Sequence, residues 1–216
     1  MSFENFFSKD SPDKKHIPLM PVVTLTADDQ WHDLVALLLE HSIDCIEITL
    51  RTPFGLPSIE KIRQRYPQCW VGAGTVRTPE QASAAAKAGA QFLVSPGWEE
   101  NLEDAVQKTQ LPWMPGIATV TELMNCLQHG WHYLKFFPAE FSGGTNALKA
   151  FSSVCPEAHF CPTGGIGLNQ IAHYLSIPEV FAVGSSGLVP VEALKQNNWQ
   201  DIVKAIQQWK LAVQVS

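Results

Sequence analysis

The chain has 216 residues, of which 45% are hydrophobic and 17% are charged. This composition supplies enough apolar material for a sizeable core and excludes a disordered chain, and the length fits one large domain better than two small ones. Fifteen Lys and Arg against 21 Asp and Glu give a net charge of −6, which argues against a nucleic-acid partner, because phosphate backbones are bound by clustered basic side chains.

The sequence contains no pattern that predicts membrane association, export or metal binding. Its longest apolar run, over 34–39, is six residues, whereas a membrane span needs roughly 20. The first fifteen residues lack the apolar stretch of a secretory signal. Five cysteines form no C-x-x-C pair and seven histidines form no H-x-H or H-E-x-x-H arrangement, so neither a disulfide framework nor a metal site is indicated. We expect a cytoplasmic protein that needs no metal or cofactor.

Short β-rich segments alternate with helical patterns along the chain. The helical spacing of Phe3, Phe6 and Phe7 predicts a short N-terminal helix within 1–16. Eight strands are predicted, over 17–25, 45–50, 70–76, 91–95, 111–117, 133–137, 159–163 and 180–184. Helices are predicted over 28–41, 56–66, 99–108, 144–154, 169–175 and 199–213.

Two further helices have signals at both of their ends. The first begins after Thr78, with Gln81 as the capping-box partner, and the second begins after Thr119, with Glu122 in that role. Each ends at a glycine, at positions 89 and 130, which suits the left-handed residue that commonly follows a helix.

The regular alternation of strand and helix predicts an α/β fold, a closed (β/α)8 TIM barrel in which residues 1–216 form a single domain. The N-terminal helix is expected to cover one mouth of this barrel. An open doubly wound sheet is the structural alternative, but its first strand would normally lead into a glycine-rich loop, and the segment 20–24 contains no glycine.

The second predicted strand carries charge on one of its faces. Ile46, Ile48 and Leu50 share the aliphatic face, which should pack against helices, so Glu47 and Arg51 on the other face should point into the barrel. A buried charge without a partner is costly. The alternative is an antiparallel strand with its polar face in water, which the strand and helix alternation disfavours.

The sixth predicted strand places a single lysine, Lys135, within a hydrophobic run. Lysine is almost never fully buried unless it is paired or used. One interpretation is a side chain that extends from a sheet edge to solvent. The other is a covalent amine, because burial favours the neutral form that attacks a ketone to give a Schiff base. Strands two and six are close enough across a narrow barrel for Glu47 to exchange protons near Lys135.

Glycines end the last two predicted strands. The segments Thr163-Gly164-Gly165-Ile166-Gly167 and Gly184-Ser185-Ser186-Gly187 follow strands seven and eight, where barrels commonly bind phosphate with backbone N–H groups. One such loop is usually just a tight connection. Two adjacent loops that carry hydroxyl groups favour a phosphate site.

When these motifs are considered together, the sequence resembles the 2-keto-3-deoxy-6-phosphogluconate (KDPG) aldolases, which overlap with the 2-keto-4-hydroxyglutarate (KHG) aldolases. The matching segments are EITLRT over 47–52, VGAGTV over 71–76, SPG over 95–97, PGI over 115–117, KFFPAE over 135–140 and CPTGGI over 161–166. The resemblance implies a (β/α)8 barrel, a homotrimer, and a metal-independent class I aldolase that cleaves KDPG to pyruvate and glyceraldehyde 3-phosphate. It also implies cleavage of 4-hydroxy-2-ketoglutarate to pyruvate and glyoxylate.

The resemblance also assigns roles to residues. It makes Lys135 the Schiff-base lysine and Glu47 the general acid and base. Substrate-binding roles go to Arg51 and Thr75 at the carboxylate, to Pro96 and Phe137 beside the pyruvyl carbons, and to Thr163, Gly164, Gly165 and Ser186 at the phosphate. Ser185 and Gly187 depart from a family that often has glycine and a bulky aromatic residue there, respectively.

Other interpretations have distinct signatures. A metal-dependent aldolase or a phosphosugar isomerase could use the same barrel, but the metal enzyme would need inward acidic and histidine ligands. A decarboxylase with an Asp-x-Lys arrangement is disfavoured, because Tyr133 and Phe137 flank Lys135. The remaining alternatives are a phosphosugar-binding barrel without turnover and an aldolase for another 2-keto-3-deoxy acid.

Overall fold

Parallel strands form the centre of the computed structural model, which describes residues 1–7 and 16–214. Residues 8–15 of the predicted N-terminal segment therefore lie outside the described residues. One sheet has six strands in the order β5-β4-β3-β2-β1-β9 and a second has the order β6-β7-β8. Their bounds are β1 Leu19–Val23, β2 Cys45–Thr49, β3 Trp70–Gly74, β4 Leu93–Val94, β5 Trp113–Met114, β6 Gly116–Ile117, β7 Tyr133–Phe136, β8 His159–Pro162 and β9 Val183–Ser185.

Local contacts connect the two sheets at two places. β5 and β6 belong to one predicted strand, which Pro115 divides because proline has no N–H to add to a ladder. The carbonyl of Pro115 still accepts a hydrogen bond from the Lys135 N–H at 2.9 Å. On the other side, isolated parallel bridges join Phe160 to Val180 and Thr163 to Gly184.

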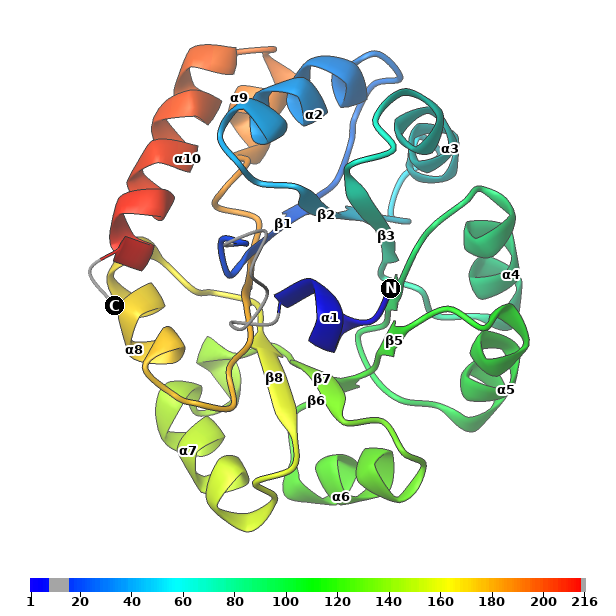
Figure 1. Ribbon diagram of the computed structural model, residues 1–216, viewed down its shortest axis with the longest axis vertical. Helices are drawn as coiled ribbons and strands as arrows, with labels where there is room; N and C mark the ends of the chain where they lie inside the picture. Colours follow the sequence, from blue (N-terminus) through cyan, green and yellow to red (C-terminus); the bar gives the residue numbers. More distant parts are fainter. Residues whose placement is uncertain (8–15, 215–216) are drawn as a thin grey trace.

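Helices surround the strands, with α1 at the centre of the view (Figure 1). The outer helices are α2 Gln30–Glu40, α3 Gly55–Arg65, α4 Pro79–Lys87, α5 Glu100–Thr109, α6 Val120–Gln128, α7 Gly144–Val154, α8 Ile171–Leu175, α9 Val191–Lys195 and α10 Trp199–Gln214. Two 3-10 turns, η1 Glu140–Ser142 and η2 Leu168–Gln170, precede α7 and α8. The sequence patterns missed α9 and η1, whereas the helix predicted over 169–175 includes α8 and two residues of η2.

The capping signals of α4 and α6 have different outcomes. The Thr119 and Glu122 capping box is present at α6, as predicted. At α4 the Thr78 hydroxyl accepts a hydrogen bond from the Gln81 N–H, but the Gln81 carboxamide accepts one from Arg77 instead of returning to Thr78. The capping box predicted for α4 is therefore wrong, although its N-cap is correct.

Strand side chains alternate between two hydrophobic layers. Ile46 and Ile48 of β2 pack with apolar side chains of α2 and α3 in the larger layer. The smaller layer lies inside the strands and holds Met20, Cys45, Met114 and Cys161 among its members. This alternation is the one the β2 sequence predicts, and it turns Glu47 towards the interior.

The N-terminal helix α1, Phe3–Phe7, covers the end of the interior where the strands begin. Phe6 stacks on Trp70, the first residue of β3, with ring centroids 4.4 Å apart. Phe3 packs against Phe92 at 5.4 Å and against Tyr133, the first residue of β7, at 6.0 Å. The phenylalanine spacing thus reflects a helix that closes this end of the molecule.

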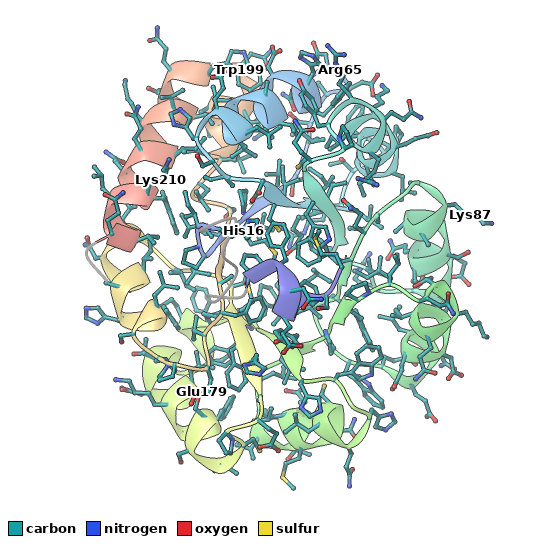
Figure 2. All side chains as sticks on the ribbon, in the orientation of Figure 1. His16, Arg65, Lys87, Glu179, Trp199 and Lys210 are labelled. Atoms are coloured by element: carbon teal, nitrogen blue, oxygen red, sulfur yellow. The ribbon has the colours of Figure 1, made fainter. Side chains whose placement is uncertain are left out.

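Charged side chains occupy the periphery. Arg65 and Lys87 lie at the outer surface of the helices in Figure 2, whereas His16 lies near the centre of the view. The Nδ1 atom of His16 is 3.0 Å from the Asp44 carboxylate.

Among the described residues, no helix combines the length and the apolar character that crossing a bilayer requires.

Candidate active site

A cavity of about 440 Å³ lies where β1, β2, β7, β8 and β9 end. Seven of the ten residues predicted from the sequence line it, namely Arg51, Lys135, Phe137, Thr163, Gly164, Gly165 and Ser186. The remaining lining residues are Val22, Thr24, Ile166, Ser185, Gly187 and Val191. The cavity therefore combines a lysine, an arginine and two glycine-containing loops from strands far apart in the chain.

Lys135 and Glu47 face each other across the interior. The Nζ atom of Lys135 lies 3.3 Å from Oε1 and 3.4 Å from Oε2 of Glu47. Only 5% of Lys135 and 1% of Glu47 are exposed. β7 and β2 belong to different sheets, so this pair forms only because both side chains point inwards. Lys135 lines the cavity and Glu47 does not, which places the carboxylate behind the amine.

A glycine that the sequence analysis did not single out makes room for Glu47. Gly74 ends β3 and pairs with Thr49 of β2. A Cβ atom at Gly74 would overlap the Glu47 carboxylate. A glycine inside a strand often marks such a close approach. The glycine at position 74 is therefore the sequence feature from which this contact could have been predicted.

The residues predicted to bind the pyruvyl end of the substrate have different positions. Arg51 lies two residues beyond β2, is exposed and lines the cavity, and within the described residues no carboxylate forms an ion pair with it. Thr75 and Pro96 do not line the cavity. Thr75 has a φ of 58°, a strained conformation for a β-branched residue that is typical of functional sites. A Cβ atom at Gly116, the β6 partner of Lys135, would overlap the Pro96 carbonyl.

The glycine loop after β8 presents unpaired backbone donors. Gly164 and Gly165 have φ values of 99° and 78°, which favour glycine. Within the described residues, neither of their N–H groups has a hydrogen-bond acceptor, and the same holds for the Ser186 N–H and hydroxyl. Successive free N–H groups in a turn form an anion-binding concavity.

Cys161 lies next to Lys135 but is a poor nucleophile. It pairs with Lys135 in the ladder between β7 and β8 and is 1% exposed. Burial raises the pKa of the Cys161 thiol to about 12, although the neighbouring Lys135 lowers it. The thiol is therefore protonated at neutral pH.

Over residues 1–7 and 16–214, no group of three or more His, Cys, Asp or Glu is arranged to hold a metal ion.

The chain as a whole is similar to known proteins. The profile of the KDPG and KHG aldolase family matches residues 12–205. The 2-dehydro-3-deoxy-phosphogluconate aldolase of Pseudomonas aeruginosa is 39% identical over 85% of this chain and 84% of its own length. The KHG/KDPG aldolase of Escherichia coli is 38% identical over 87% of this chain and 88% of its own.

A solved structure extends the comparison to three dimensions. The KDPG aldolase of Legionella pneumophila, captured with pyruvate as a covalent carbinolamine intermediate, superposes with a TM-score of 0.85. The two chains are 41% identical, over 88% of this chain and 92% of the other. The family profile spans most of the chain, and both relatives align with it over more than four fifths of their own length. The chain therefore belongs to the KDPG and KHG aldolase family.

Proposed function

We propose that this chain cleaves 2-keto-3-deoxy-6-phosphogluconate to pyruvate and glyceraldehyde 3-phosphate at the cavity, through a Schiff base on Lys135. It is a lyase of the aldolase class, and 4-hydroxy-2-ketoglutarate is a second substrate, cleaved to pyruvate and glyoxylate. The observation that carries the proposal is the buried contact of 3.3 Å between the Lys135 amine and the Glu47 carboxylate beside a cavity with free backbone donors.

The first stage joins lysine to substrate. Glu47 accepts a proton from the Lys135 ammonium, and the neutral amine attacks the C2 ketone. Glu47 then returns the proton to the hydroxyl group of the carbinolamine, which leaves as water to give a protonated imine. A buried amine within hydrogen-bond distance of a carboxylate suits this stage, because the proton moves between two groups that are already in contact.

The second stage breaks the carbon chain. Glu47, through a water molecule, takes the proton of the C4 hydroxyl, the C3–C4 bond breaks, and its electron pair moves into the imine to form an enamine. Glyceraldehyde 3-phosphate leaves. The enamine is then protonated at C3, and hydrolysis of the resulting imine releases pyruvate and restores the amine.

The remaining site residues bind the substrate. Arg51, assisted by Thr75, holds the substrate carboxylate, because the guanidinium has two parallel donors and no carboxylate among the described residues competes for it. Pro96 and Phe137 flank the pyruvyl carbons, and the Phe137 ring centroid is 5.3 Å from Nζ of Lys135. The phosphate binds the N–H groups of Gly164 and Gly165, with Thr163 and Ser186 beside them.

Trapping with borohydride tests the covalent step. Reduction in the presence of pyruvate should add one pyruvyl group to the chain, and peptide mass spectrometry should place it on Lys135. Lys135→Met should give no adduct and should lower the cleavage rate by at least about 10³-fold, since covalent catalysis is lost. Unchanged pyruvate release by this variant would contradict the proposal, and so would activity abolished by a chelator. A wild-type chain that releases no pyruvate would favour a phosphosugar-binding protein.

The arrangement of the sheets supports a finer description of the fold. We propose that the two sheets form one closed (β/α)8 barrel within a single domain, 1–216. The contiguity of β5 and β6 and the bridges between the β8 and β9 segments support this closure.

We also propose that the chain forms a homotrimer in a reducing cytoplasm. The resemblance to the family supports the trimer, and five free cysteines support the compartment. Sedimentation at equilibrium tests the trimer.

A further inference from the structure

The phosphate-binding part of the cavity depends on backbone geometry. The basic residues of the cavity are Lys135 of β7 and Arg51, which lies two residues beyond β2, whereas the two loops after β8 and β9 present glycine and serine. A cradle made of neutral N–H groups binds an anion only when these groups converge on it. Whatever holds the loop over 164–167 in place therefore controls phosphate binding.

The turn that follows the catalytic lysine holds the start of this loop. The N–H of Ala139 donates to the Thr163 carbonyl at 2.8 Å, and the N–H of Glu140 donates to the Gly164 carbonyl at 3.1 Å. In a trans peptide the carbonyl and the following N–H point in opposite directions. Anchoring these two carbonyls therefore turns the N–H groups of Gly164 and Gly165 away from η1.

The Glu140 side chain reaches the far end of the same loop. Its Oε2 atom accepts a hydrogen bond from Gln170 Nε2 at 3.1 Å, and Gln170 Oε1 accepts one from the Gly167 N–H at 2.8 Å. Its Oε1 atom accepts a hydrogen bond of 2.5 Å from the hydroxyl of Tyr174, which is 0% exposed. Glu140 thus connects both ends of the glycine loop to Tyr174, whose side chain is buried in the core.

Neutral donors hold this carboxylate. Among the described residues, no Lys, Arg or His forms an ion pair with Glu140. Burial, and to a smaller extent the bond to Glu140, raises the pKa of Tyr174, so the phenol stays a donor at neutral pH. A carboxylate beside an anion site is electrostatically unfavourable, and its two oxygens are directed to Tyr174 and Gln170 instead.

We propose that Glu140 is a positioning residue that orients the loop over 164–167 for the substrate phosphate, acting through Gln170 and Tyr174. This inference rests on the proposed function, in which that loop binds the phosphate. Glu140 contacts neither the lysine nor the pyruvyl part in the proposed mode of binding. Its removal should therefore affect phosphorylated and unphosphorylated substrates differently.

Steady-state kinetics with KDPG and with 4-hydroxy-2-ketoglutarate test this selectivity. Glu140→Ala should raise the KM for KDPG and the inhibition constant of inorganic phosphate by about tenfold or more. The kinetics with the unphosphorylated substrate and the rate of borohydride trapping with pyruvate should change by less than about twofold. Glu140→Gln keeps an acceptor for Gln170 and a hydrogen-bonding group for Tyr174, and should restore most of the affinity for phosphate.

A second variant tests the same link if Glu140→Ala does not fold. Gln170→Ala leaves the Tyr174 bond to Glu140 in place and removes only the link to Gly167, and it should show the same selective loss. Equal effects on both substrates, or none on either, in both variants would overturn the positioning role. A wild-type chain that neither prefers KDPG nor responds to inorganic phosphate would overturn the phosphate cradle itself, and the role of Glu140 with it. Intact borohydride trapping on Lys135 would then show that the Schiff-base mechanism stands.

Discussion

At the scale of single residues, the contact between Lys135 and Glu47 depends on a residue that has no side chain. Glu47 occupies the space that a Cβ atom at Gly74 would need. The carboxylate is 1% exposed, so it has little room to retreat without losing the amine. Catalytic groups must be held within about 0.5 Å of their productive positions, and a single methyl group therefore decides whether this pair forms.

Gly74→Ala should displace the Glu47 carboxylate and lower kcat for KDPG cleavage by at least about 10²-fold, which is the usual contribution of a general acid or base. Gly97→Ala is the matched control, because a Cβ atom there meets nothing within 4 Å. The measurement is pyruvate release under saturating substrate. Wild-type kcat in a folded Gly74→Ala variant would show that the position of Glu47 is unimportant.

The sequence predicts those site residues that follow from strand alternation. Glu47 and Lys135 are the charged positions of otherwise uncharged strands, so their inward direction follows from the order of residues along each strand. The roles of Glu140 and Gly74 cannot be inferred in this way. Glu140 acts through Tyr174, which is 34 positions away along the chain, and only the folded chain brings the two together.

At the scale of elements, α1 contributes more to the stability of the fold than its length of five residues suggests. Phe6 is 4% exposed and its ring stacks on His16 at 4.1 Å as well as on Trp70. A helix this short is not stable in isolation. Its stability comes from the aromatic side chains at the amino ends of the strands.

Phe6→Ala should lower the free energy of unfolding by about 3 to 5 kcal/mol, the usual cost of removing a buried aromatic ring. Phe141→Ala removes a phenylalanine that is 84% exposed, and it should change stability by less than about 0.5 kcal/mol. Urea denaturation followed by tryptophan fluorescence measures both. Equal stability of the two variants would mean that α1 is not part of the cooperative core.

The helix α6 has a strong local signal and was predicted, whereas α9 has none and was missed. Thr119 and Glu122 cap α6 as their spacing indicates, because capping is an interaction between neighbours in sequence. The helix α9, Val191–Lys195, has five residues and no side-chain cap, which leaves little periodicity to detect. Pro115 divides the fifth predicted strand, and its effect depends on which neighbour the strand meets.

At the scale of the whole molecule, burial of titratable groups makes stability depend on pH. His159 begins β8 and stacks on Tyr133 with ring centroids 4.8 Å apart. Burial lowers the pKa of His159 below its usual value of 6.5 in the folded chain. The unfolded chain, with its ordinary pKa, binds a proton first as pH falls. The stability associated with the neutral ring is therefore fully present above pH 6.5 and is lost as pH falls towards the lower folded pKa.

His159→Gln should reduce the loss of stability between about pH 7 and pH 5, because the group responsible for part of it is absent. His173→Gln, which changes an exposed histidine of α8, should retain the wild-type loss over the same range. Urea midpoints at several pH values measure the difference. Parallel pH profiles for wild type and His159→Gln would show that His159 does not contribute.

The position of α1 has a consequence for how the chain is made. The helix α1 is translated before the aromatic rings on which Phe3 packs, which lie at positions 70, 92, 133 and 181. At a synthesis rate of about 5 to 20 residues per second, the helix waits roughly 10 seconds or longer for the last of these rings to be translated. Docking of α1 is therefore complete only late in the synthesis of this chain.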